Sequence, residues 1–111
     1  MAYAAIRQYE MGAGSVSEFV RLVDQGLAEE LSGQAGFVGY QVITSGADEV
    51  VSVSVFDDED SAIRSNQLAA EFVRDHLQQF QLNLTAAMSG EVRISRTAQR
   101  PGEPDRPQPP A

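Results

Sequence analysis

The stretch GFVGYQVITSGADEVVSVSVF, residues 36–56, decides the fold because it reads as two strands joined by a tight turn. Residues 37–44 and 49–56 are rich in β-branched and aromatic side chains, and the sequence SGAD between them consists of turn formers. Glycine weakens a strand, so we expect Gly36 to end the preceding loop and Gly39 to leave one strand face empty. The stretch therefore predicts a β-hairpin.

The register of this hairpin follows from the turn length. A four-residue loop at 45–48 pairs Thr44 with Glu49 and places Tyr40 opposite Val53. In this register one face is apolar, and we expect it to lie beneath helices; it contains Val38, Tyr40, Val42, Val51, Val53 and Val55. The opposite face pairs Gln41 with Ser52 and Gly39 with Ser54, and Phe37 lies near Phe56 at its end.

The flanking segments predict two more strands and two helices. Residues 3–9 alternate as a strand, and Ser15 begins a capping box before a helical apolar pattern that continues to Leu31. DDED at residues 57–60 begins a second helix that reaches about residue 80, and residues 85–95 form the last strand. The order βαββαβ predicts an α+β, ferredoxin-like fold, with a four-stranded antiparallel sheet and both helices on one face.

We expect one domain over residues 1–96 and a disordered, Pro-rich tail over residues 97–111, since all five prolines follow residue 100. The net charge of −8 disfavours nucleic acid and anionic membranes as partners. The first ten residues contain no long apolar segment, and no apolar run reaches membrane-spanning length. The default expectation is a cytoplasmic protein.

The second face of the sheet has no third layer in the sequence to cover it. Apolar residues are expected there, namely Phe37, Ile43, Val50 and Phe56. In the outer strands, alternation assigns Ala4, Ile6 and Met88 to the helix side and Tyr3, Arg7, Tyr9, Ser89 and Glu91 to the open side. Arg7 and Glu91 are then candidates for a cross-strand pair. A bare apolar face requires a partner, so we predict a homodimer joined through the open sheet faces.

The second helix contains an unusual polar residue. Its apolar stripe consists of Ala62, Ala69, Val73, Leu77 and Phe80, and Asn66 falls inside this stripe. In the register above, Tyr40 points into the same layer. An amide and a phenol facing a gap walled by Ala62, Ala69 or Ala70, with Val53 opposite Tyr40, form a candidate site for a carbonyl or phenolate oxygen. The alternative is a structural Asn66 bonded to a backbone carbonyl or to Tyr40.

Other candidates have weaker support from the sequence. His76, the single histidine, lies at the border of the stripe; it contacts a large ligand or only complements the helix dipole. Arg7 lines a barrel cavity or forms polar dimer contacts. The DDED acids are expected to cap a helix, not to bind metal. Without cysteine, and with no phosphate-binding glycine pattern opening a helix, we expect no metal and no tightly bound cofactor.

Residues 3–95 resemble the antibiotic-biosynthesis-monooxygenase-like group of the dimeric α+β barrel superfamily. The resemblance rests on the βαββαβ order, AGFVGYQV at residues 35–42, VVSVSVFDDEDSA at residues 50–62 and SGEV at residues 89–92. It implies a homodimer whose sheets face each other, and in some members cofactor-free oxidation of a phenolic polyketide between sheet and helices. The haem-degrading branch uses an Asn, a Trp and a His; this chain has no Trp and carries Arg7 where that branch places its Asn.

Two functions remain open from the sequence. The first is cofactor-independent oxygenation of an aromatic, polyketide-like or quinone-like small molecule, with Asn66 and Tyr40 as catalytic residues. Ala62, Ala69, Ala70, Val53, Arg7 and His76 are then the substrate-binding candidates. The alternative is a non-catalytic dimeric barrel that binds a small apolar ligand or has a structural or stress-related role.

Overall fold

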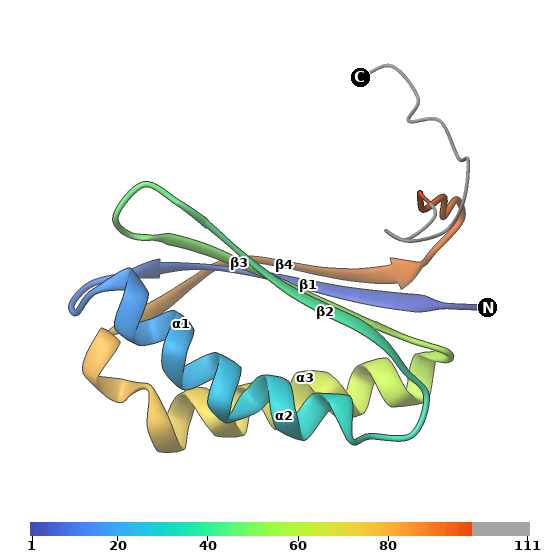
Figure 1. The fold of residues 1–111 in the computed structure, drawn as a ribbon, viewed down its shortest axis with the longest axis horizontal. Helices are drawn as coiled ribbons and strands as arrows, with labels where there is room; N and C mark the ends of the chain where they lie inside the picture. Colours follow the sequence, from blue (N-terminus) through green and yellow to red (C-terminus); the bar gives the residue numbers. More distant parts are fainter. Residues whose placement is uncertain (99–111) are drawn as a thin grey trace.

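The computed structural model describes residues 1–98, so most of the segment predicted as a disordered tail, residues 99–111, lies outside the described part. The elements are β1 (Tyr3–Met11), α1 (Val16–Gln25), α2 (Leu27–Ser32), β2 (Phe37–Ser45), β3 (Glu49–Phe56), α3 (Glu59–His76), the short 3₁₀ helix η1 (Gln78–Phe80) and β4 (Leu82–Glu91). The antiparallel sheet has the strand order β2-β3-β1-β4. All helices lie on one face of the sheet (Figure 1). The predicted ferredoxin-like fold is confirmed.

The first predicted helix is divided in two at Gly26. Ser15 caps α1 as expected, since its hydroxyl accepts a hydrogen bond from the Glu18 backbone N–H at 3.2 Å. At Gly26 the backbone leaves helical geometry, and a Cβ there would lie 2.5 Å from the Phe72 ring of α3. The missing side chain lets α3 approach the junction between α1 and α2, which the apolar periodicity alone did not reveal.

The predicted hairpin register is wrong by one residue. Ser45, not Thr44, pairs with Glu49, and Tyr40 lies opposite Ser54 instead of Val53. The loop is one residue shorter than expected, with Gly46 at φ +65°, and an irregularity in pairing follows Phe37. Tyr40 and Val42 stay on the helix side as predicted, but they now pair with Ser54 and Ser52 of β3. Val51, Val53 and Val55 therefore lie on the open face instead of the helix side.

The face assignments of β1, β3 and β4 are therefore reversed. Arg7 is only 7% exposed and pairs in the ladder with buried Ser52, beneath the helices. Ile6 is paired with Val53 on the open face, and Met88 on that face is 67% exposed. The predicted Arg7–Glu91 pair is also wrong, because Tyr3 lies opposite Glu91.

Small residues explain why the polar face is the buried one. Helix α3 buries Ala62, Ser65 and Ala69 against the sheet, and the Ser65 and Ser54 hydroxyl oxygens are 3.3 Å apart. The Ser65 hydroxyl donates to the Ala62 carbonyl at 2.6 Å. Both hydroxyls find partners inside the layer, so they can be buried without a large penalty, and α3 packs close to the sheet.

The larger core side chains lie at the two ends of this layer. Phe19 meets Phe80 edge to face with ring centroids 5.4 Å apart, and Phe37 meets Phe56 at 5.7 Å. Phe56 and Val50 were predicted for the open face, but both are fully buried beneath the helices. No helix within residues 1–98 is long and apolar enough to span a membrane.

The open face of the sheet remains apolar with a different set of residues. Val38 and Ile43 of β2 are 54% and 53% exposed, and Met88 of β4 lies at the other edge. Between them, the alternate residues of the central strands point to the same side: Ala4, Ile6, Val51, Val53 and Val55. Within the described residues no helix or strand covers this face (Figure 1), and Val92, Ser95 and Thr97 of the segment after β4 border the hollow that Val53 and Val55 line.

Candidate functional site

A buried guanidinium lies at the centre of the candidate site. Arg7 projects from the middle of β1 into the layer between sheet and helices. Its Nη1 donates a hydrogen bond to the side-chain oxygen Oδ1 of Asn66 on α3. Asn66 thus has neither of the partners predicted for a structural role, since its partner is a charged side chain.

The remaining guanidinium nitrogens of Arg7, Nε and Nη2, are fully buried and have no hydrogen-bond partner within residues 1–98. Among residues 1–98, no carboxylate forms an ion pair with Arg7, since the ion pairs there join Arg21 to Glu18, Arg74 to Asp75 and Arg93 to Glu91. A buried charge without a counter-charge is strongly unfavourable. Within the described residues, Arg7 thus has two buried donors that are available for an acceptor.

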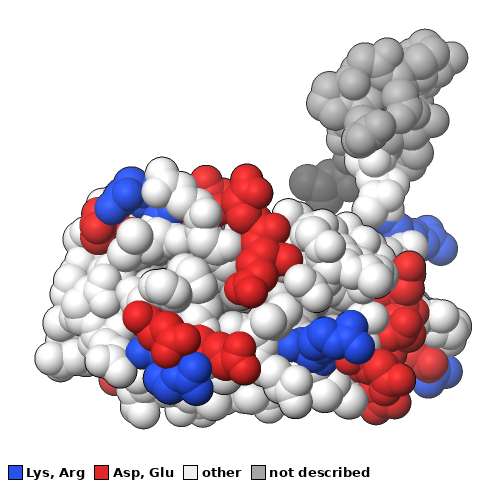
Figure 2. All heavy atoms as spheres, turned by 90° about the horizontal axis from the view of Figure 1, so that it is seen from below, with Lys and Arg blue, Asp and Glu red and all other residues white. Residues whose placement is uncertain are grey.

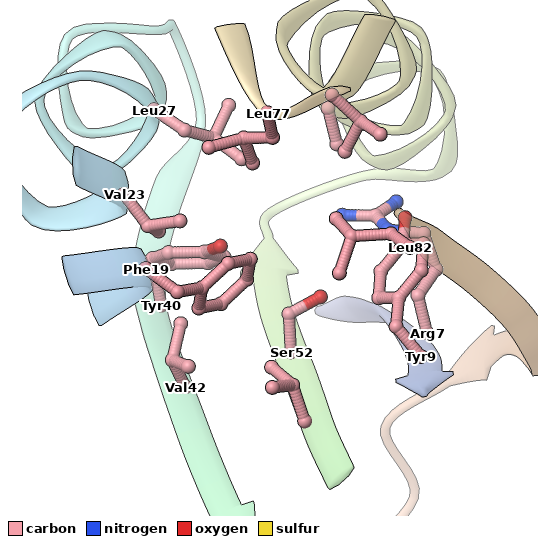
Figure 3. Close-up of a pocket in the computed structure, with 13 residues that line it drawn as sticks. Arg7, Tyr9, Phe19, Val23, Leu27, Tyr40, Val42, Ser52, Leu77 and Leu82 are labelled. Carbon is pink, nitrogen blue, oxygen red and sulfur yellow. The ribbon is translucent and has the colours of Figure 1, made fainter. Parts of the chain in front are cut away.

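A small, partly enclosed cavity of about 20 Å³ lies next to Arg7 and is called the enclosed cavity below. Arg7 and Tyr9 of β1 lie on one side, Tyr40 and Val42 of β2 on the other, with Ser52 of β3 between them (Figure 3). Side chains of the helices, including Phe19, Leu27 and Leu77, close it from the opposite side. This volume is enough for one water molecule and too small for an aromatic ring.

The two tyrosines of this cavity are held in the neutral form. Burial raises the pKa of Tyr40 to about 12, and the positive charge of Arg7 opposes part of that rise. Burial likewise raises the pKa of Tyr9, again against the effect of Arg7. Near neutral pH both phenols can donate a hydrogen bond, and neither is a general base.

A larger groove of about 350 Å³ opens between α3 and β4. Arg7, Tyr9 and Asn66 line it together with Ala70, Leu84, Ala87 and Ser89, and its lining also includes Ile6 and Met88, whose side chains belong to the open face of the sheet. Its volume and mostly apolar walls suit a small aromatic molecule. Arg7 and Tyr9 line both spaces and so lie between the enclosed cavity and the groove.

The structure separates the residues that the sequence predicted to share one site. Tyr40 lines the enclosed cavity with Ala69, whereas Asn66 lines the groove with Ala70. Ala62 is buried in the core and lines neither space. Arg7 lines both spaces: it contacts Asn66 at the groove and lies beside the cavity that Tyr40 lines.

The last two sequence candidates lie away from this layer. Val53 points to the open face, where it lines a separate hollow with Val38 and Val55. The reason is the register slip, which reversed the faces of β3. His76 is exposed at the end of α3, and its ring packs on Phe72 with centroids 4.9 Å apart.

Tyr9 is the residue that the sequence analysis missed as part of the site. The signal was present, because Tyr9 lies two residues after Arg7 and so shares its strand face. Tyr9 was predicted with Arg7 to lie on the open face, so it was not considered as a neighbour of Tyr40 and Asn66 beneath the helices.

The acidic run at residues 57–60 acts as a helix cap. The Asp58 carboxylate accepts a hydrogen bond from the Ser61 backbone N–H at 2.7 Å, and this bond lowers its pKa. Within residues 1–98, no three His, Cys, Asp or Glu side chains converge as a metal site would require. On the helix face, acidic and basic side chains are interspersed with uncharged surface (Figure 2).

Comparison with known proteins gives a family match and several structural neighbours. Residues 2–82 match the family described as antibiotic biosynthesis monooxygenase. No curated protein matches the sequence.

Three solved structures illustrate the similarity of the fold. SnoaB, a cofactor-independent oxygenase from Streptomyces nogalater, is 19% identical with a TM-score of 0.59, over 86% of this chain and 95% of that one. MupZ from Pseudomonas fluorescens is 14% identical with a TM-score of 0.66, over 79% and 69%. A dimeric ferredoxin-like protein from an uncultured marine organism is 15% identical with a TM-score of 0.65, over 87% and 99%.

Proposed function

Because the chain belongs to the antibiotic biosynthesis monooxygenase family, we propose that it binds an electron-rich aromatic small molecule in the groove between α3 and β4 and oxygenates it with O₂, without a cofactor. The neighbour SnoaB is a cofactor-independent oxygenase, which supports this reaction class. In such chemistry the substrate anion itself supplies the electrons that reduce O₂. The task of the protein is to bind that anion and to orient it.

The observation that carries the proposal is the contact between Asn66 and Arg7. Because Arg7 donates to Oδ1, the amide of Asn66 is fixed with its NH₂ group on the other side, free to donate. Asn66 lines the groove, so a substrate oxygen there can accept from this NH₂ group. A donor held in place before the reaction stabilises negative charge that develops on such an oxygen.

The test is oxygen uptake with an enolisable anthrone as the probe substrate, after treatment of the protein with a chelator. We expect uptake above the rate in buffer alone, with conversion to the quinone. Asn66→Ala and Asn66→Leu should each lower the rate about 100-fold, the usual cost of removing one such donor. Asn83→Ala, which changes an exposed asparagine on β4 outside the groove, is the matched control.

The result also separates this function from the non-catalytic alternative. Asn66 variants that oxidise the anthrone as fast as the unchanged protein would contradict the role of Asn66. An unchanged protein that binds the anthrone without oxygen uptake would favour a binding barrel over an oxygenase. Thermal midpoints of all variants show whether a lost rate reflects unfolding.

We also propose that a second copy of the chain covers the open sheet face. The support is the row of exposed or half-exposed apolar residues on that face, including Val38, Ile43 and Met88, for which no layer exists within the described residues. A neighbour of the same fold is a dimer. Arg7 and Asn66 lie on the other side of the sheet, beneath the helices, whereas Ile6 and Met88 line the groove and also belong to the face that the second copy would cover.

A further inference from the structure

The unpartnered edge of Arg7 has a specific chemical shape. Nε and Nη2 lie on the same side of the planar guanidinium, where their N–H bonds run parallel. Nη1, outside this edge, is already used by Asn66. Two parallel donors of this kind match the two oxygens of a carboxylate, which they bind as a bidentate pair.

From this edge we infer that the ligand of the α3–β4 groove is an aromatic carboxylate, whose carboxylate pairs with Nε and Nη2 of Arg7. The inference rests on the proposed function for the aromatic character of the ligand. It adds the polar group by which the ligand is recognised: the carboxylate binds Arg7, and Asn66 remains free to donate to a second oxygen on the ring.

The charges around the groove favour a single negative charge. Among the described residues that line it, Arg7 is the only charged side chain, and the other polar groups there are Tyr9, Asn66 and Ser89. A doubly charged phosphate would lack a second cation, whereas one carboxylate neutralises Arg7 completely. A water molecule in the enclosed cavity would supply hydrogen-bond partners but would leave the charge of Arg7 uncompensated.

A partner subunit on the open face cannot supply this counter-charge. Arg7 lies on the helix side of the sheet, opposite Ser52 in the ladder and beneath α3. The open face carries the neighbouring residues Ile6 and Gln8, which point the other way. The groove is therefore the route by which an anion reaches Arg7.

Access requires a modest rearrangement of the side chain. Both free nitrogens are closed to solvent in the unliganded protein. Since Arg7 lines both the enclosed cavity and the groove, an anion reaches the Nε–Nη2 edge by a movement that retains the contact of Nη1 with Asn66. In that arrangement the carboxylate accepts hydrogen bonds from Nε and Nη2 of Arg7.

Three probes with the same ring system test the inference: naphthalene-2-carboxylate, its primary amide of equal size, and the smaller 2-naphthol. Their affinities for the full chain are measured at pH 7 by titration calorimetry and by the NMR chemical shifts of the protein's backbone amides, so that no turnover is needed. We expect the carboxylate to bind at least about tenfold more tightly than the amide or the naphthol. The shifts should centre on β1, α3 and β4.

Variants of Arg7 show whether this preference depends on the guanidinium. Arg7→Met should abolish the preference for the carboxylate. Arg7→Lys should retain only part of it, because an ammonium group lacks the parallel pair of donors. Arg21→Met, which removes an exposed arginine of α1, is the matched control and should bind like the unchanged protein.

The inference is overturned if the amide or the naphthol binds as tightly as the carboxylate, if none of the three binds, or if the preference persists in Arg7→Met. These outcomes are independent of catalysis. Carboxylate selectivity without oxygen uptake would overturn the proposed reaction alone, and oxygen uptake without carboxylate selectivity would overturn this inference alone.

Discussion

Removing the charge of Arg7 should stabilise the protein. A double-mutant cycle with Asn66 measures the coupling energy between the two side chains and so shows how much of the effect depends on their contact. Arg7→Met keeps an unbranched side chain but removes a buried cation with two unsatisfied nitrogens. Each unsatisfied donor costs roughly 1–3 kcal/mol, and replacing buried charges by apolar groups stabilises proteins by up to about 4 kcal/mol. The lost hydrogen bond to Asn66 opposes this gain. We expect a net gain of about 1–3 kcal/mol, or roughly 4–12 °C in the thermal midpoint for a domain of this size.

Asn66→Leu should act in the opposite direction. It removes the hydrogen-bond partner of a guanidinium that has no other, at a cost of about 1.5–3 kcal/mol. In the double variant the cation is gone, so the leucine no longer leaves a charged group unpaired. We expect the double variant to be about as stable as Arg7→Met alone, which gives a coupling energy of about 1.5–3 kcal/mol.

The assay is urea unfolding of the unchanged protein, both single variants and the double variant at one protomer concentration. Arg21 and Gln25 on α1 give a matched cycle, because they are also a guanidinium–amide pair, at 3.3 Å, but exposed. Arg21→Met and Gln25→Leu should show coupling below about 0.5 kcal/mol. The reasoning is refuted if Arg7→Met lowers stability by more than about 1 kcal/mol, since Arg7 would then be satisfied in the folded protein.

Three further outcomes follow from the structure. Sedimentation equilibrium of the full chain at micromolar concentration should show a dimer that Val53→Arg on the open face weakens, whereas Ile63→Arg on the exposed side of α3 does not; a monomeric unchanged protein would contradict the proposed assembly. The pKa of Tyr40 is raised from 10.0 to about 12 in the folded protein. The contribution of the neutral Tyr40 phenol to the free energy of unfolding is therefore complete below pH 10 and is lost as the pH rises to 12. Urea unfolding from pH 9 to 12 should therefore show a steeper loss for the unchanged protein than for Tyr40→Phe, and parallel curves would exclude this cause. Gly26→Ala should lower the free energy of unfolding by about 1–3 kcal/mol, because its Cβ would overlap the Phe72 ring. Gly33→Ala, whose Cβ meets only ordinary contacts, should lower it less when urea unfolding of both variants is compared.

The sequence predicted the fold well because each element carries its own local signal. The Ser15 cap of α1 and the acidic cap that begins α3 are short-range features, and both are confirmed, whereas the hairpin turn was placed one residue too early and α3 ends at His76 instead of about residue 80. The break at Gly26 was missed because its cause is not local: it depends on Phe72, which lies 46 positions further along the chain.

The faces of the sheet could not be assigned from alternation alone. Period-two patterning shows that Val51, Val53 and Val55 share one face and that Ser52 and Ser54 share the other. It does not show which face lies beneath the helices, and the usual assumption that the apolar face does so was wrong here. The signal that could have reversed the assignment lies on α3, where Ala62, Ser65 and Ala69 are too small to fill a layer against valines but pack closely against serines.

Arg7 illustrates the same limit at the site. A single arginine in a strand is assigned to the exposed face by default, because burial of an unpaired cation costs free energy that few side chains can offset. The chain nevertheless buries it, fixes one nitrogen with Asn66 and leaves the other two without partners. In the inference above, a bound anion compensates this cost. The departure from the default therefore carries the functional information, and the stability gained by Arg7→Met should be accompanied by the loss of the ligand.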